Sequence, residues 1–233
     1  MSTSIETEHE LGPYKFYQRK PSHRLTAVTV LLCDFVESSF NDNCNVIDLG
    51  TASAVIPMLL SLKSKSCHFT GIEISEELIK TAERNLKENN LGGRISLINS
   101  DWRDLYDKFS GGSFTHVVSN PPYMKEGASR LSPDKVRRAA RAEVYGNMSD
   151  LVKVSKYLAG NSGRIYYVYP MERLEDLKET ITNEGLTIGR YKEVFTQKKD
   201  GVTGDAEFFL IEFGVGCKLV KEESVTLDGS RIY

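Results

Sequence analysis

The sequence predicts an α/β fold with a mostly parallel sheet of seven strands and helices on both faces. Short apolar runs alternate with segments of helical periodicity along most of the chain, which is typical of parallel strands joined by helical crossovers. Small or polar residues follow these runs directly, as at Gly50. The last two runs, 186–195 and 206–213, have only a loop between them. Because so short a connection cannot make a parallel crossover, we expect an antiparallel last strand.

Each element has a local signal. The clearest helix covers 75–89, where Ser75 can cap the first turn and two acids favour the positive end of the helix dipole. In the helix near 54–62, Pro57 is tolerated only in the first turn. The other predicted strands are 46–49, 67–74, 94–99, 114–119 and 163–169, and the other predicted helices are 25–35, 148–158 and 171–183.

The chain is long enough for one large α/β domain. We assign residues 41–216 to this domain and 1–40 to an N-terminal tail and capping segment, the first twelve residues being mobile. Residues 217–233 are expected to form a polar C-terminal tail, and 198–205 a flexible loop. We expect a monomer.

Composition excludes several classes of protein. The net charge of −2 provides no strong overall field toward nucleic acid, so any such contact must come from a local patch. The four cysteines form no C-x-x-C pair, and neither they nor the histidines suggest a metal site, so we expect reduced thiols. There is no secretory signal and no apolar run long enough to span a bilayer. These features predict a cytoplasmic protein that binds neither membrane nor metal.

Three polar signals follow three successive predicted strands. The small-residue turn after Asp48 allows close backbone approach to a ligand. Glu73 lies 23 residues after Gly50, where an acid can bind both ribose hydroxyls of an adenosine-bearing cofactor. Asp101 can accept from an adenine amino group, and the indole of Trp102 can pack on the adenine face. A nicotinamide cofactor is disfavoured because the turn lacks the G-x-G-x-x-G pattern that binds a pyrophosphate.

The fourth signal is Asn120-Pro121-Pro122-Tyr123, which follows the apolar run before it. An exocyclic amino group on a base is a poor nucleophile, because its lone pair is delocalised into the ring. An asparagine side-chain oxygen and a proline carbonyl can each accept one of its N–H bonds, and the prolines stiffen the loop. Tyr123 can stack on the base. This loop predicts methyl transfer to an amino group, with positioning as the main source of catalysis.

These motifs resemble the class I, S-adenosylmethionine-dependent methyltransferases of amino groups, which have a Rossmann-like fold. Over nearly the whole chain, the sequence is similar to the bacterial tRNA adenine-N6 methyltransferases that modify valine tRNA beside the anticodon. The narrower resemblance rests on His23-Arg24-Leu25-Thr26, Arg138-Ala139-Ala140-Arg141-Ala142-Glu143 and Tyr169-Pro170-Met171-Glu172-Arg173. It implies catalytic roles for Asn120, Pro121, Pro122 and Tyr123. It implies S-adenosylmethionine binding by Thr26, Asp48, Gly50, Thr51, Ala52, Glu73, Ile74, Asp101, Trp102 and Asn120.

The chain departs from this family at three positions. Relatives usually have glycines where this chain has Ala52 and Ala54, and an acid where it has Val28. All three lie where the methionine half of the cofactor is expected. An alanine methyl weakens cofactor binding if the backbone there needs a positive φ.

A basic segment follows the Asn-Pro-Pro-Tyr loop. We predict nucleic-acid contacts by Lys125, Arg130, Arg137, Arg138 and Arg141. The expected partner is tRNA or another structured RNA, and an adenosine in an anticodon loop is already partly unstacked. Three alternatives remain open: glutamine methylation of a protein, guanine-N2 methylation of rRNA, and an RNA-binding protein with a degenerate cofactor site. Neutralising Arg137, Arg138 and Arg141 would spare a protein substrate.

Overall fold

A computed structural model describes residues 6–19, 26–121, 147–197 and 203–227. In these ranges nine strands form one sheet in the order β10-β8-β9-β7-β6-β3-β4-β5, with β11 also paired to β8. The seven predicted strands are β3 (Asn45–Leu49), β4 (His68–Glu73), β5 (Ile95–Asn99), β6 (His116–Ser119), β7 (Arg164–Pro170), β8 (Thr187–Gln197) and β9 (Thr203–Gly214). As predicted, β9 is antiparallel to its neighbours β7 and β8, whereas the pairs from β7 to β5 are parallel.

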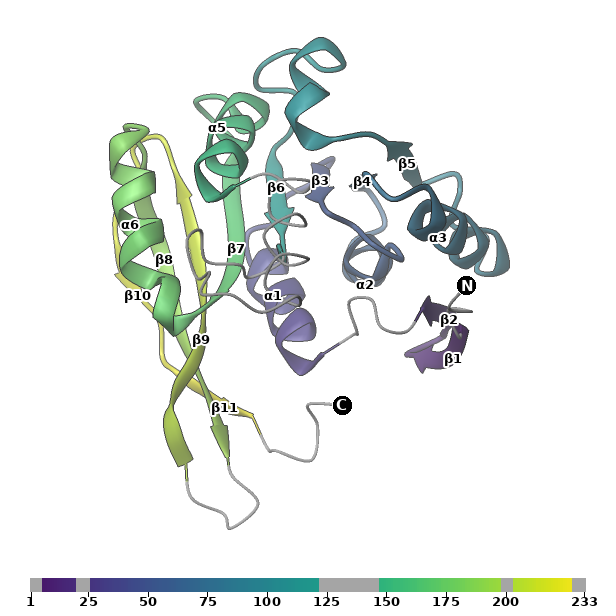
Figure 1. The fold of residues 1–233 in the computed structure, drawn as a ribbon, viewed down its shortest axis with the longest axis horizontal. Coiled ribbons are helices and arrows are strands. Elements are labelled where there is room, and N and C mark those ends of the chain that lie inside the picture. Colours follow the sequence, from purple (N-terminus) through teal and green to yellow (C-terminus); the bar gives the residue numbers. More distant parts are fainter. Residues whose placement is uncertain (1–5, 20–25, 122–146, 198–202, 228–233) are drawn as a thin grey trace, which may run out of the picture.

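Helices cover both faces of this sheet (Figure 1). One face carries α1 (Ala27–Glu37), α2 (Val55–Lys63) and α3 (Glu76–Glu88), and the other carries η1 (Trp102–Asp107), α5 (Met148–Ala159), η2 (Met171–Arg173) and α6 (Leu174–Asn183). Neighbouring strand residues alternate between the two apolar cores, with Val46 in one and Ile47 in the other. Among the described residues, no helix is long and apolar enough to cross a membrane.

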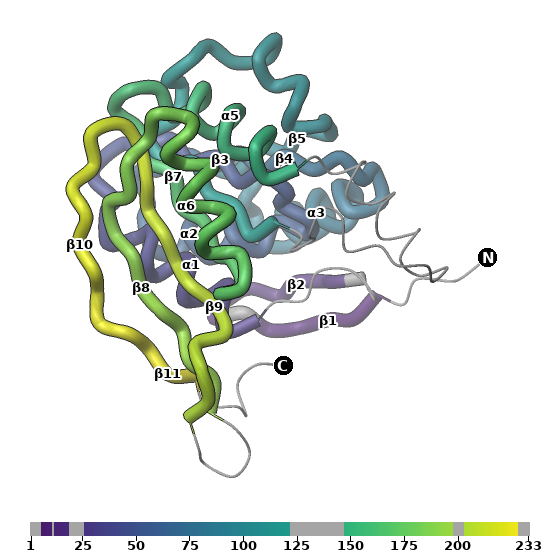
Figure 2. The backbone as a smooth tube through the Cα atoms, turned by 60° about the vertical axis from the view of Figure 1, so that its left-hand side comes forward, coloured from purple at the N-terminus to yellow at the C-terminus, as the bar shows by residue number. Residues whose placement is uncertain are grey.

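The N-terminus differs from the expected mobile tail. Residues Glu6–Leu11 (β1) and Tyr14–Arg19 (β2) pair as an antiparallel hairpin, separate from the main sheet (Figure 2). Asn85 of α3 holds β2, because its Oδ1 accepts from the Tyr17 N–H at 2.7 Å and its Nδ2 donates to the Tyr17 carbonyl at 3.0 Å. The acid-rich β1 has no apolar pattern, so only this long-range docking reveals it as a strand.

The C-terminal part also pairs more than the sequence suggests. Within the predicted polar tail, β10 (Val220–Lys221) and β11 (Val225–Leu227) lie parallel to β8 at the edge of the sheet. β9 begins at Thr203, inside the segment predicted as a loop. Strands of two or three residues are too short to show a period of two, so they are found only through their partner.

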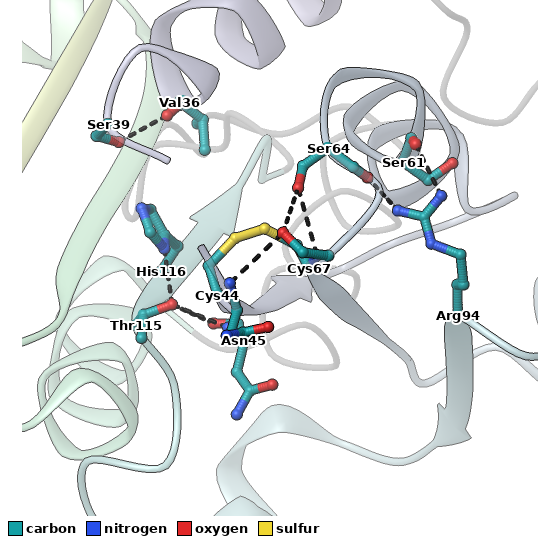
Figure 3. The surroundings of a disulfide bond; sticks show 12 residues. Val36, Ser39, Cys44, Asn45, Ser61, Ser64, Cys67, Arg94, Thr115 and His116 are labelled. Atoms are coloured by element: carbon teal, nitrogen blue, oxygen red, sulfur yellow. Dashed lines mark hydrogen bonds between the residues drawn. A yellow bond between two sulfur atoms is a disulfide. The ribbon is translucent and has the colours of Figure 1, made fainter. Parts of the chain in front are cut away.

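The prediction of four reduced cysteines is wrong for two of them. Cys44 and Cys67 form a disulfide with a Cα–Cα distance of 4.5 Å (Figure 3). Each cysteine directly precedes a strand, and the strands that follow are paired in parallel with Asn45 opposite His68. Cys44 and Cys67 are therefore cross-strand neighbours, which a separation of 23 residues in sequence does not show. Cys33 and Cys217 are free.

Candidate active site

The sequence-predicted polar residues meet at one edge of the sheet. The parallel register places Leu49 beside Ile72, Glu73 beside Asn99, and Asp48 beside Val118. The segments that follow β3, β4, β5 and β6 therefore leave the sheet side by side. This is the edge at which open parallel sheets bind ligands.

The turn after β3 winds tightly around the end of β4. The N–H groups of Gly50 and Thr51 both donate to the Ile72 carbonyl, at 2.9 and 2.8 Å. Three residues of the turn have left-handed backbone conformations: φ is +83° at Gly50, +49° at Ala52 and +64° at Ala54. Gly50 adopts this conformation without strain, whereas the two alanines do so at a cost. The backbone at both alanines therefore has the positive φ that favours glycine.

Replacing Ala52 or Ala54 by glycine should raise the free energy of unfolding by roughly 0.5–1 kcal/mol for each change. Glycine removes the strain of the left-handed conformation, and its more flexible unfolded state offsets part of that gain. Urea unfolding measures the effect. Ala82→Gly in α3 is the matched control and should be destabilising, because Ala82 is as fully buried as Ala54 but is helical. If all three changes were destabilising, the left-handed backbone at Ala52 and Ala54 would not be strained.

Glu73 connects two of these turns. Its Oε2 accepts from the Ala52 N–H at 3.0 Å, and its Oε1 accepts from the Ser75 N–H at 2.9 Å. The side chain is buried, but each carboxylate oxygen retains a second lone pair for a ligand hydroxyl. Ile74 follows it and is half-buried. This arrangement fits the predicted contact with a ribose.

Asp48 lies beneath the turn in an unusual state. It is 1% exposed, and neither carboxylate oxygen has a partner within hydrogen-bond geometry. The Thr51 hydroxyl is also buried and unpartnered, and a methyl group at Gly71 would come within 2.8 Å of it. Burial, assisted by the Glu73 carboxylate, raises the pKa of Asp48 to about 7, while the nearby Thr51 hydroxyl acts in the opposite direction.

These unpartnered atoms bear on the fit of a cofactor. The part of the chain that the structure describes has buried, unpartnered side-chain polar atoms at Asp48, Thr51, Arg94 and Trp102. Three of these four residues belong to the sites predicted for S-adenosylmethionine. Buried polar groups are normally paired, so their concentration here is consistent with a ligand site. The residues present therefore fit the cofactor.

Asp101 and Trp102, the pair predicted to contact adenine, already make contacts within the protein. Asp101 caps η1 by accepting from the Arg103 N–H at 2.8 Å, and it also forms an ion pair with the Arg103 side chain. Trp102 is 7% exposed and packs in the core with Leu105. The Cζ3 atom of its ring lies 3.5 Å from the position that a Cβ atom on Gly50 would occupy. Adenine contacts by Asp101 and Trp102 stay predictions.

Asn120 directly follows β6, beside the turn that follows β3. The preceding Ser119 donates its hydroxyl to the Leu49 carbonyl at 2.7 Å, which ties the end of β6 to the end of β3. The Asn120 Nδ2 donates to the hydroxyl of Thr29 in α1 at 3.2 Å. Thr26, a predicted cofactor residue, caps α1 by accepting from the Thr29 N–H at 3.4 Å. Val28 is buried in the core below.

Sequence reasoning missed the contact of Thr29 with the candidate catalytic residue Asn120. Thr29 lies 91 residues from Asn120, and no motif links the two. Pro121 is buried after Asn120. The remaining predicted residues, Pro122, Tyr123, Lys125, Arg130, Arg137, Arg138 and Arg141, lie outside the described residues. In the described ranges, no three His, Cys, Asp or Glu residues form a group that could hold a metal ion.

Comparisons with known proteins identify the family of this chain. A family model described as a methyltransferase domain matches residues 40–201. A tRNA1(Val) (adenine(37)-N6)-methyltransferase of Glaesserella parasuis is 28% identical over 193 residues, covering 80% of this chain and 78% of that protein. Its namesake in Mannheimia succiniciproducens is 29% identical over 203 residues, covering 84% and 80%.

Solved structures agree on the fold. The structure of TYW2 from Pyrococcus horikoshii, in complex with MeSAdo, aligns with a TM-score of 0.63 at 13% identity, covering 91% of this chain and 72% of that one. The predicted Rossmann-like methyltransferase fold is confirmed. Because the family model matches well over half of the residues, the chain belongs to the methyltransferase domain family and is an S-adenosylmethionine-dependent methyltransferase.

Proposed function

We propose that this chain methylates the exocyclic N6 amine of an adenine in the anticodon loop of a tRNA. The observation that carries the proposal is the position of the Asn120 amide at the end of β6, beside the turn that follows β3. The names of the relatives support the same reaction, since those proteins act on adenine 37 of a valine tRNA.

The proposed chemistry depends on acceptors for the amine. The Asn120 Oδ1 and the Pro121 carbonyl each accept one N–H of the target nitrogen, which withdraws its lone pair from the ring and leaves it available for bonding. When bound, S-adenosylmethionine supplies an activated methyl group on its sulfonium. This chain therefore contributes positioning and polarisation. Together they can reduce the activation free energy by several kcal/mol, the largest possible reduction being about 10 kcal/mol.

Residues on the sheet edge divide the task of holding the cofactor. Glu73 would bind the ribose hydroxyls through its remaining lone pairs, and the Gly50 turn would receive the methionine half, with Asp48 and Thr51 beneath it. Tyr123 would stack on the target base, and the basic residues Lys125, Arg130, Arg137, Arg138 and Arg141 would contact phosphates. We further propose that the protein acts as a monomer and that its substrate is tRNA in the cytoplasm.

The decisive experiment identifies the methylated product. We would incubate the protein with labelled S-adenosylmethionine and unmodified bulk tRNA, digest the RNA to nucleosides, and identify the label by mass. We expect N6-methyladenosine from the wild type, and far less of it in the same time from Asn120→Ala. In parallel reactions, labelled N2-methylguanosine in added rRNA, or labelled glutamine in an added release factor, would replace the proposal with one of its alternatives.

A second variant separates RNA from protein substrates. Changing Arg137, Arg138 and Arg141 together to glutamine should abolish tRNA methylation at moderate salt and leave the affinity for S-adenosylmethionine unchanged. The reason is that each lost phosphate contact removes a counterion-release contribution. Full methylation of tRNA by the triple variant, with an unchanged salt dependence, would contradict the role of this segment.

A further inference from the structure

A chain of three side chains links the candidate catalytic asparagine to the start of α1. The Asn120 Nδ2 lies 3.2 Å from the Thr29 Oγ1, which lies 3.3 Å from the Thr26 Oγ1. Thr29 is 4% exposed, so water does not compete for its hydroxyl. Thr26 is fixed in turn as the cap of α1.

The Thr29 hydroxyl oxygen accepts from the Asn120 Nδ2, so the nitrogen side of the Asn120 amide faces α1. Either threonine hydroxyl can donate to the other in the Thr26–Thr29 pair. Because a hydroxyl oxygen has two lone pairs, Thr29 can accept from Asn120 in both cases. The Thr26 Oγ1 also accepts from the Thr29 backbone N–H at 3.4 Å.

We propose that Thr29 is a positioning residue that fixes the orientation of the Asn120 amide and thereby selects an amino group over a carbonyl at the target. The inference rests on the proposed function for the identity of that target. With Nδ2 committed to Thr29, the amide presents Oδ1 to the substrate. A target amine donates N–H bonds, so it needs this oxygen. A rotated amide would present N–H instead, which repels an amine and suits a keto oxygen.

Kinetics with matched variants test the positioning. Thr29→Val keeps the shape and removes the hydroxyl, whereas Thr29→Ser keeps the hydroxyl. We expect kcat to fall about tenfold in Thr29→Val with little change in KM for S-adenosylmethionine, and to stay within about threefold of wild type in Thr29→Ser. Thr81→Val in α3 is the control for the loss of a buried hydroxyl away from the site, and should keep wild-type kcat.

Selectivity is the readout that a structural role would not move. We would measure binding of a valine-tRNA anticodon stem-loop with adenosine, and of the same RNA with inosine, whose keto oxygen replaces the amine. The wild type should prefer the adenosine RNA, and Thr29→Val should reduce this preference about tenfold. An unchanged preference in a folded Thr29→Val, together with an unchanged kcat, would overturn the inference.

A measurement without RNA separates this inference from the proposed function. The side-chain amide protons of Asn120, assigned by their loss in Asn120→Asp, should exchange slowly in the wild type and Thr29→Ser and faster in Thr29→Val. Equal exchange in all three would overturn the orientation by Thr29 even if tRNA is the substrate. Slow exchange in a wild type that does not methylate tRNA would retain the orientation and refute only the proposed substrate.

Discussion

Asp48→Asn should stabilise the cofactor-free protein at pH 8 by as much as about 4 kcal/mol. Burial raises the pKa of Asp48 to about 7, against roughly 3.9 in an unfolded chain, and a tenfold change in a protonation equilibrium corresponds to about 1.4 kcal/mol. Above pH 7 the folded protein therefore contains a buried, unpartnered carboxylate, which asparagine replaces with a neutral group of the same shape.

The sign of the pH dependence follows from proton binding. Between about pH 4 and pH 7 the folded state retains a proton on Asp48 that the unfolded state has lost, so the stability of the wild type falls as the pH rises through this window. Asp48→Asn removes this contribution. Urea unfolding from pH 5 to pH 8 should show a wild-type advantage or parity at low pH and a growing advantage of the variant above it.

A matched control keeps this test specific. Asp107→Asn, at the exposed end of η1, makes the same chemical change on the surface and should leave the pH profile unaltered. If the free energies of unfolding of the wild type and Asp48→Asn changed with pH in parallel, the wild type would not contain a buried carboxylate without a partner. Calorimetry with S-adenosylmethionine then tests the predicted cofactor contact of Asp48, which should make the affinity of Asp48→Asn lower than that of the wild type.

Asn120→Ala should lower kcat by about 10²–10³-fold. The expected size is that of removing one pre-organised hydrogen-bonding group from a site where charge develops. Asn120→Asp should lower kcat less, because a carboxylate oxygen still accepts from the target amine. Single-turnover rates with saturating S-adenosylmethionine and tRNA measure both effects.

The fold of both variants can be checked independently. The amide of Asn120 is only partly buried, and the link between β6 and β3 is made by Ser119, so unfolding midpoints should stay close to wild type. A kcat for Asn120→Ala within threefold of wild type would exclude the catalytic role of this loop, whichever nucleotide is methylated.

Local patterns in the sequence determined the seven strands β3 to β9, the helices between them and their order. An apolar run before Gly50 predicts a buried strand, and Ser75 with its two following acids predicts a helix start, because each signal lies within a few adjacent residues. The order of strands and helices then implies a parallel sheet, and the parallel sheet implies that Gly50, Glu73, Asp101 and Asn120 share one edge.

Tertiary structure alone decided the contacts that join distant segments. Thr29 meets Asn120, Cys44 meets Cys67, and Asn85 holds the hairpin at Tyr17, across separations of 91, 23 and 68 residues. The raised pKa of Asp48 and the left-handed backbone of Ala52 depend likewise on burial and on the path of the turn. Such properties arise where packing brings separate elements together, and no periodicity within one element encodes them.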